Sequence, residues 1–244
     1  MPRFFVPSQN ISKDKIIVSD RKQAHYIKDV LRLKVKDELV IFDEKENEYT
    51  CLLEKLQPEV TLYIKEMFLA ALNSKKINLT VACAIPKKSD MDDIIDKLTQ
   101  LGAARIIPLK TQRTIVKLDE KKKQLRLNHW QKVAQSASEQ SQRKSLPIIE
   151  TIKDIKEVLT ETKEYDLKLI PTLTGERKSL KEILEKVKPK NILVLVGPEG
   201  DFSEGEISLA KKSGCIAVSL GKQVLRVETA AVAVASYIKF LYQI

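Results

Sequence analysis

The sequence has few of the residues that bind metals or form disulfides. It contains two histidines, His25 and His129, and three cysteines that stand singly at positions 51, 83 and 215. No CxxC pair occurs, so a structural zinc site and a redox pair are both disfavoured, and we expect no bound metal. Isolated cysteines suit a reducing compartment, which favours a cytoplasmic location. The scarcity of histidine also argues against a Ser-His-Asp site.

No secretory leader is expected, and the sequence contains no long apolar run. Its first residues, MPRFFVP, contain no apolar signal segment. The most apolar stretch, TAAVAVASYIKFLY at 229–242, is short for a membrane span and includes Lys239, so we expect a buried or interface helix. A chain of 244 residues with 43% apolar and 31% charged residues is expected to form one large globular domain or two modest ones.

The charge is unevenly distributed along the chain. The formal net charge is +10, yet residues 1–72 hold 12 basic and 12 acidic residues. Residues 105–144 alone hold 11 basic and 3 acidic residues. A basic excess in one segment indicates a polyanionic partner such as nucleic acid, although a solvated lysine-rich surface would give the same count.

Residues 1–72 are predicted to form a small, β-rich, barrel-like domain. Three short apolar runs, at 38–43, 48–56 and 60–68, are separated by polar turns and are typical of strands. One helix interrupts them, with Ser19 as its expected cap and Ala24, Ile27, Val30 and Leu31 on one face.

Residues 73–244 alternate strands with helices, after a predicted linker at 73–76. Strands are expected in INLTVACAI, ARIIPL, LKLIPT, NILVLVG and CIAVSLG. Expected helix caps are Ser89, Thr151, Ser179 and Ser203, and a long basic helix is expected from about Asp119 to Ser141. This alternation predicts a mostly parallel sheet with helices on both faces.

Three strand ends carry unusual sequences, at a place where open α/β sheets bind ligands. They are IPTLTG at 170–175, GPEGDFS at 197–203 and LGKQVLRVETAA at 220–231. No GxGxxG or GxxxxGK[ST] motif occurs, Pro198 removes a backbone donor, and Glu199 adds a negative charge. A ligand without phosphates, such as S-adenosylmethionine, fits these limits better than a nucleoside triphosphate or a dinucleotide. A simple tight turn is the alternative for GPEG alone.

The third of these segments places Arg226 between Leu225 and Val227. An arginine between apolar residues after a glycine turn suggests ligand binding. A surface ion pair with the following Glu228 is the alternative.

Taken together, LVGPEGDFSEGEI and LGKQVLRVETAAVAVASY resemble the SPOUT-class methyltransferases that modify uridine N3 in 16S ribosomal RNA. Further matches are RFF at Arg3, HYIKDVLRL at His25, DKLTQLGAARIIPLKTQRT at Asp96 and WQKVAQSASEQSQR at Trp130. The resemblance covers the whole chain. It implies an N-terminal PUA-like β-barrel for RNA recognition (1–72) and a SPOUT α/β methyltransferase domain (73–244) with a trefoil knot.

The resemblance also implies S-adenosylmethionine as cofactor and a homodimer acting on ribosomal RNA, with an assembled small subunit favoured over naked RNA. Arg226 becomes the candidate catalytic residue, stabilising the uracil anion, with Glu199, Glu228 or water as alternative bases. The expected cofactor-binding residues are Thr172, Leu173, Gly197, Pro198, Glu199, Gly200, Leu220, Gly221, Val224, Leu225, Arg226 and Thr229.

Several basic and polar residues are expected to contact RNA. For Arg143 a favourable position at a helix C-terminus is the alternative, and for His25 simple packing. The expected set is Arg3, His25, Arg32, Lys97, Arg113, Glu139, Gln140 and Arg143, with support from the lysines at 121–123.

One departure from the family pattern concerns Asp201, where the family usually has glycine. Aspartate tolerates a positive φ, but it would crowd a ligand if the family's glycine is there to provide space.

Two rival functions remain open. One is a SPOUT methyltransferase that acts on a ribose 2′-OH or on transfer RNA, and the other is a non-catalytic RNA-binding protein with a decayed cofactor pocket. The position of the modified uridine does not follow from the sequence.

Overall fold

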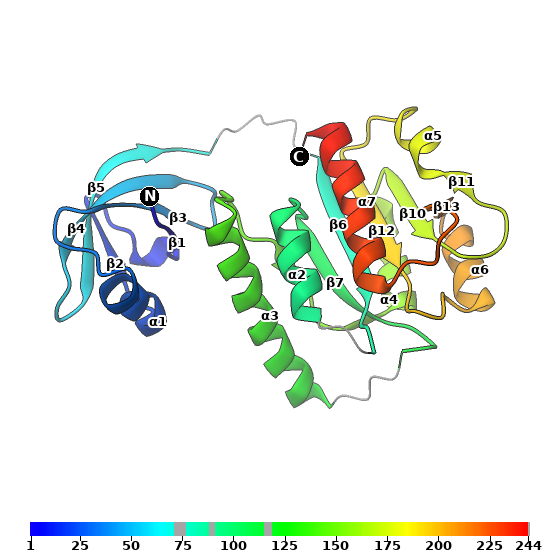
Figure 1. Cartoon of the computed structure of the whole chain (residues 1–244), viewed down its shortest axis with the longest axis horizontal. Helices are drawn as coiled ribbons and strands as arrows, with labels where there is room; N and C mark the ends of the chain where they lie inside the picture. The colour runs from blue at the N-terminus through cyan, green and yellow to red at the C-terminus, as the bar shows by residue number, and fades with distance from the viewer. Residues whose placement is uncertain (71–76, 88–90, 115–118, 244) are drawn as a thin grey trace. The chain divides into compact units, whose positions relative to one another are not determined.

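The computed structural model describes residues 1–70, 77–87, 91–114 and 119–243 (Figure 1). The chain divides into two compact units, one made of Met1–Ser74 with Ser138–Leu146 and one made of Lys75–Ala137 with Pro147–Ile244. The predicted linker 73–76, the predicted boundary at 72/73 and the predicted cap Ser89 lie outside the described residues. The grouping of 138–146 with the first unit has no counterpart in the sequence prediction.

The first unit is built on a curled five-stranded sheet with the order β1-β3-β4-β5-β2. Strand β1 pairs with β3 in parallel, and the other pairs are antiparallel. The side chains of β4 alternate between buried and partly exposed, and Tyr49, Cys51 and Leu53 enter the core. The strands are β1 (Arg3–Phe5), β2 (Lys15–Val18), β3 (Glu38–Phe42), β4 (Glu48–Lys55) and β5 (Val60–Phe68).

The helical segment of the first unit begins one residue later than predicted. Asp20, not Ser19, is the N-cap of α1 (Arg21–His25), and its carboxylate accepts the amides of Lys22 at 2.7 Å and Gln23 at 3.2 Å. A carboxylate accepts two free amides of the first turn and carries the negative charge that a helix N-terminus favours. This explains why Asp20 rather than Ser19 is the cap. The segment continues as a π-helical turn, η2 (Tyr26–Val30), and η1 (Ser8–Asn10) precedes β2.

The second unit is built on an eight-stranded sheet, and every strand pair in the described residues is parallel. Its order is β11-β13-β10-β12-β6-β7-β8, with β9 paired to β7. This confirms the predicted parallel sheet, and the order is consistent with the predicted knot. The strands are β6 (Asn78–Ala84), β7 (Arg105–Lys110), β8 (Ile148–Ile149), β9 (Lys153–Asp154), β10 (Leu167–Pro171), β11 (Lys178–Ser179), β12 (Asn191–Val196) and β13 (Ile216–Ser219).

Helices cover both faces of this sheet, as the two core clusters show. Along β12, Ile192 and Val194 enter one cluster while Leu193 and Leu195 enter the other, which explains the uninterrupted apolar run of this strand. The helices are α2 (Met91–Gln100), α3 (Glu120–Gln140), α4 (Ile155–Thr160), η3 (Thr162–Glu164), α5 (Leu180–Leu184), α6 (Glu204–Lys212) and α7 (Val227–Tyr242).

The predicted helix caps of this unit have different outcomes. Ser203 caps α6 in a capping box with Glu206, as predicted. Ser179 is the N-cap of α5 but makes no side-chain capping bond. Thr151 was predicted to cap the next helix, and this prediction was wrong. The N-cap of α4 is Asp154, which forms a capping box with Glu157. Both Thr151-x-x-Asp154 and Asp154-x-x-Glu157 fit the capping pattern, and the second coincides with the end of β9.

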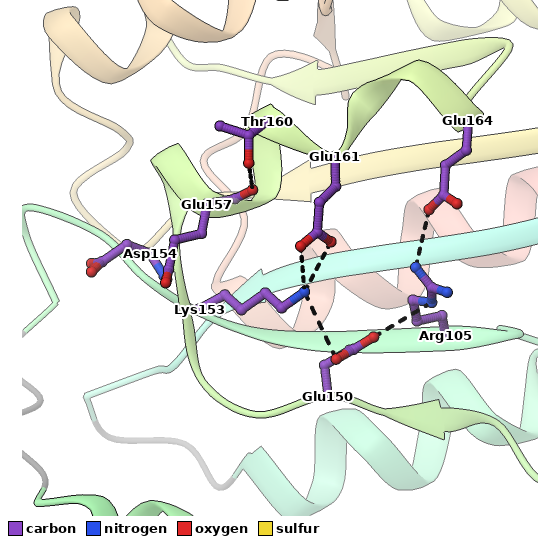
Figure 2. Close-up of polar contacts among 8 residues, drawn as sticks. All are labelled: Arg105, Glu150, Lys153, Asp154, Glu157, Thr160, Glu161 and Glu164. Carbon is purple, nitrogen blue, oxygen red and sulfur yellow. Dashed lines mark hydrogen bonds and ion pairs between the residues drawn. The ribbon is translucent and has the colours of Figure 1, made fainter.

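A polar network joins the edge of the sheet to α4 and η3 (Figure 2). Lys153 lies between Glu150 and Glu161, and Arg105 lies between Glu150 and Glu164. The distance from Arg105 Nη1 to Glu164 Oε1 is 3.0 Å, and the distance from Lys153 Nζ to Glu161 Oε2 is 2.9 Å. Both cations are therefore engaged by carboxylates from within the same unit. Among the described residues, no helix has the length and apolarity that a membrane span requires.

Candidate functional site

A cavity opens at the ends of β10, β12 and β13, which are adjacent in the sheet in the order β13-β10-β12. The space within it measures about 520 Å³, including the part open to solvent. Its lining residues come from all three predicted segments and their neighbours. They are Pro171, Thr172, Leu173, Arg177, Val196, Gly197, Pro198, Glu199, Asp201, Leu220, Gly221, Gln223, Leu225, Val227 and Ala230.

Most of the residues predicted to bind the cofactor lie around this cavity. Those among the described residues that do not line it are Gly200, Val224, Arg226 and Thr229. The sequence prediction of cofactor-binding residues omitted Pro171, Arg177, Val196, Asp201, Gln223, Val227 and Ala230. Most of these residues stand within two positions of a predicted one, so widening each segment by two residues would have found them. Arg177 lies further along, and no local pattern marks it.

Gly197 is the point where β12 ends against a buried ring. A Cβ at this position would lie 2.9 Å from Cδ2 of Phe202, which is too close for any side chain. Phe202 is 2% exposed and belongs to the core cluster below the sheet. The turn can therefore lie directly on the core only because residue 197 has no side chain.

Gly221 is required for a different reason. Its φ is +123°, a conformation that side chains disfavour, while an added Cβ would meet only Gln223 Oε1 at 3.8 Å. The Ser219 hydroxyl holds this turn, donating to the Gly221 carbonyl at 3.2 Å and accepting its amide at 3.3 Å. The backbone conformation, rather than space, thus selects glycine here.

Asp201, which stands where the family usually has glycine, has a φ of +64°. The position needs the left-handed conformation, and aspartate is one of the few other residues that adopt it. The side chain is nevertheless not directed into solvent, because the residue is only 9% exposed. Asp201 lines the cavity, and its carboxylate binds backbone amides there.

The two carboxylates considered as bases lie near the end of β6. Glu199 accepts the amide of Lys87 at 3.1 Å, and Glu228 lies in the first turn of α7. Burial, together with the negative charges of Glu228 and Glu199, raises the pKa of the Cys83 thiol well above its usual range. Cys83 is therefore a buried, neutral thiol near these two acids.

Arg226 is exposed at the start of α7 and is the N-cap of that helix. Its carbonyl accepts the amide of Ala230 at 2.8 Å, and its side chain makes no capping bond. The neighbouring residues Leu225 and Val227 both line the cavity. Arg226 therefore stands in the chain between two lining residues, although it does not itself line the cavity.

In the second unit, two residues predicted to contact RNA bind other protein groups. Lys97 pairs with Asp93 at 2.6 Å along α2. Arg113 donates to the carbonyl of Gly200, which ties the loop after β7 to the GPEG turn. Arg113 thus lies beside the cavity.

In the first unit, Arg3, Glu139 and Arg143, all predicted to contact RNA, take part in bonds at the end of α3. Glu139 accepts the amide of Phe5 at 3.1 Å and the Gln23 side chain at 2.9 Å. Arg3 donates to the carbonyl of Arg143 at 2.9 Å and pairs with Glu48 at 2.8 Å. These contacts explain why 138–146 belongs to the first unit.

The other predicted RNA contacts differ in exposure. Arg143 is partly buried, and this burial lowers the pKa of its guanidinium to about 10. His25 is exposed and contacts Asp29 at 2.7 Å. Arg32, with a φ of +51°, and Gln140 are also exposed.

Three basic residues of 105–144 pair with acids outside that segment. Lys110 pairs with Asp154 at 3.6 Å and Lys144 with Glu48 at 3.9 Å, in addition to the two carboxylates on Arg105. Lys121 and Lys132 are exposed and have no ion-pair partner in the described ranges. The cationic surface is therefore smaller than the sequence count indicates, and it includes these two lysines of α3.

Comparisons with known proteins cover both units. A family model described as an RNA methyltransferase domain matches residues 73–239, and one described as an RNA methyltransferase PUA domain matches residues 11–62. A Rickettsia conorii protein named ribosomal RNA small subunit methyltransferase E is 31% identical over 98% of this chain and 95% of its own length.

Two solved structures resemble the whole chain. A Neisseria gonorrhoeae ribosomal RNA small subunit methyltransferase E bound to S-adenosylmethionine has a TM-score of 0.86 and 29% identity, covering 99% of this chain and 98% of that one. A Legionella pneumophila protein solved with S-adenosylmethionine as bound cofactor has a TM-score of 0.87 and 27% identity, covering 98% and 96%.

Proposed function

The chain belongs to the family of the ribosomal RNA small subunit methyltransferases E, and from this premise we propose that it methylates N3 of a uridine in 16S ribosomal RNA. It is an S-adenosylmethionine-dependent methyltransferase. The observation that carries the proposal is the cavity at the ends of β10, β12 and β13, lined by the segments that the resemblance assigned to the cofactor.

The residues around the cavity fit this cofactor. Gly197 lets the backbone lie flat on Phe202, and Gly221 adopts a conformation that side chains disfavour, so each of these two lining glycines offers only main chain to a ligand. Two carboxylates, Glu199 and Asp201, line the cavity and would repel a phosphate. Arg177 also lines the cavity, but it donates to the carbonyl of Thr172, so the two carboxylates favour a cationic ligand without phosphates, as S-adenosylmethionine is.

We assign the chemical roles around this cavity as follows. When bound, S-adenosylmethionine supplies a methyl group on a positively charged sulfur. Uracil N3 loses its proton to Glu199, Glu228 or water, and the freed electron pair forms the new N–C bond as the C–S bond breaks. Arg226, which stands in the chain between the lining residues Leu225 and Val227, is assigned to stabilise the negative charge on the uracil ring and so to lower the cost of losing the proton.

Replacing Gly221 with alanine is expected to weaken S-adenosylmethionine binding about tenfold. Alanine disfavours a φ of +123° by roughly 1–2 kcal/mol, so the turn is expected to relax away from the conformation that lines the cavity and to need that energy again to bind the cofactor. Calorimetric titration with S-adenosylmethionine measures this. Gly205→Ala is the matched control, because Gly205 lies in α6 with nothing near an added Cβ, and it should bind as the unmodified protein does. Equal affinity in both variants would contradict the assigned pocket.

The form of the RNA substrate is the next part of the proposal. We propose that the enzyme acts in the cytoplasm on an assembled small subunit. The first unit supports this, because its 1–72 segment has no net charge and so cannot bind naked RNA through bulk charge alone. Methylation rates on purified 16S RNA and on small-subunit particles should differ, with the particle faster. A faster rate on naked RNA would oppose this part of the proposal.

A homodimer is also proposed. Helix α7 packs its buried residues, including Ala231 and Ala235, within its own unit. Near its end, Phe240 is 75% exposed and Leu241 is 39% exposed, which leaves apolar surface for a second copy. Light scattering on the purified chain should give twice the mass of 27.7 kDa, and Phe240→Asp should give the monomer mass. A monomeric unmodified protein would contradict the dimer.

A further inference from the structure

We propose that Asp201 is a positioning residue that joins two walls of the cofactor cavity through its carboxylate. The inference rests on the proposed function, because the cavity is taken as the S-adenosylmethionine site. The two walls are the loop after β10, which contains Thr172 and Leu173, and the turn after β12, which runs from Gly197 to Phe202.

The backbone conformation of Asp201 sets the direction of its side chain. The residue closes the turn by donating its amide to the carbonyl of Pro198 at 2.9 Å, with φ at +64°. Few residue types adopt this conformation readily, and of these only aspartate carries a charged acceptor. The turn thus holds a carboxylate at a defined position on the cavity wall.

Both carboxylate oxygens accept backbone amides. Oδ2 accepts the amide of Leu173 at 2.7 Å, and Oδ1 accepts the amide of Phe202 at 2.8 Å. The residue is 9% exposed, so water competes weakly for these two bonds. Hydrogen bonds to an ionised acceptor are about twice as strong as neutral ones, so this contact fixes the loop after β10 against the turn after β12.

Each side of this link is itself anchored to the sheet. On the β10 side, the Thr172 amide donates to the carbonyl of Val218 at 3.2 Å, and Arg177 donates to the carbonyl of Thr172 at 3.0 Å. On the β12 side, the Phe202 ring lies in the core below Gly197. Movement of one wall is therefore resisted by the other, and the carboxylate sets the width of the cavity between them.

The link also determines which groups of Leu173 can meet a ligand. Its amide is already bonded to Asp201, so a cofactor can meet only its carbonyl or its side chain, which is 40% exposed. Asp201 therefore acts on the cofactor indirectly, through the placement of Leu173. We expect loss of the carboxylate to release this loop and to weaken cofactor binding without removing any catalytic group.

Two substitutions at position 201 test the effect of the carboxylate separately from the effect of the backbone conformation. Asp201→Asn keeps the size and the tolerance of positive φ, but its amide group offers one oxygen acceptor in place of two. Asp201→Gly keeps the conformation and removes both acceptors. Glu204→Gln is the matched control, because it removes an exposed negative charge in the first turn of α6 and touches no wall of the cavity.

The measurement is calorimetric titration with S-adenosylmethionine at a temperature where all variants are fully folded. Asp201→Asn should raise Kd about tenfold, Asp201→Gly should raise it at least as much, and Glu204→Gln should leave it unchanged. In turnover assays, KM for S-adenosylmethionine should rise while kcat at saturation stays close to that of the unmodified protein. A purely structural role would lower the melting temperature and leave Kd unchanged.

The outcomes distinguish this inference from the function on which it rests. If the unmodified chain binds S-adenosylmethionine and both Asp201 variants bind it equally well, the link between the walls is overturned and the function stands. Tighter binding by Asp201→Gly would mean that the carboxylate obstructs the cavity, which also overturns the inference. If the unmodified chain binds no S-adenosylmethionine, the proposed function is refuted and the positioning role is refuted with it.

Discussion

Replacing Arg226 with alanine is expected to lower kcat by about 100- to 1,000-fold, the usual effect of removing one group that stabilises developing charge. The affinity for S-adenosylmethionine should change by less than about threefold, because Arg226 is not among the residues that line the cavity. The start of α7 should remain intact, since the Arg226 side chain makes no capping bond and its carbonyl remains to accept the Ala230 amide.

Two further variants sharpen this prediction. Arg226→Lys keeps the positive charge but loses the planar donor fork, so it should recover only part of the lost rate. Lys222→Ala removes a charge from the same exposed loop without touching the cavity lining and should keep full turnover. Single-turnover kinetics with a saturating cofactor measure the chemical step. Near-normal turnover in Arg226→Ala, or an equal loss in Lys222→Ala, would refute the assigned role.

Replacing Phe202 with alanine is expected to lower the free energy of unfolding of the second unit by about 3–5 kcal/mol. The ring is 2% exposed and supports the GPEG turn from below, so its loss leaves a cavity under Gly197. Urea denaturation followed by the fluorescence of Trp130 reports on this unit, because Trp130 is the single tryptophan and lies in its core. Cofactor binding should weaken as well.

Leu125→Ala is the matched control for this stability change. Leu125 is 60% exposed on α3, so its truncation should change the free energy of unfolding by less than about 0.5 kcal/mol. A loss below about 1 kcal/mol in Phe202→Ala would mean that the ring does not support the turn, and the account of Gly197 would then be wrong.

The parts of the fold that the sequence predicted are those with a strong local pattern. The run NILVLV could be recognised as a central strand because it is buried on both faces, and Ser203 with Glu206 gave an unambiguous cap. Where two patterns overlapped, as at Thr151 and Asp154, local information did not decide between them. Strands β1 and β2 have three and four residues, too few to show a period.

The parts that the sequence could not predict depend on residues distant along the chain. Glu139 binds Phe5 across 134 positions, so nothing near Glu139 indicates that the end of α3 belongs with the first unit. Leu173 and Asp201 are 28 positions apart, and their contact exists only because β10 and β12 are neighbours. The basic count of 105–144 was likewise reduced by Glu48, Asp154 and Glu164, which lie outside it.

The central claim is that this chain transfers a methyl group to uridine N3 in the small ribosomal subunit. The most direct test incubates the purified protein with S-adenosylmethionine and unmethylated small-subunit particles, then identifies the methylated nucleoside by mass spectrometry. The account predicts N3-methyluridine at one position of 16S RNA, formed by the unmodified protein and almost absent with Arg226→Ala. Methylation on a ribose 2′-oxygen, or no methylation while the particle is bound, would contradict it.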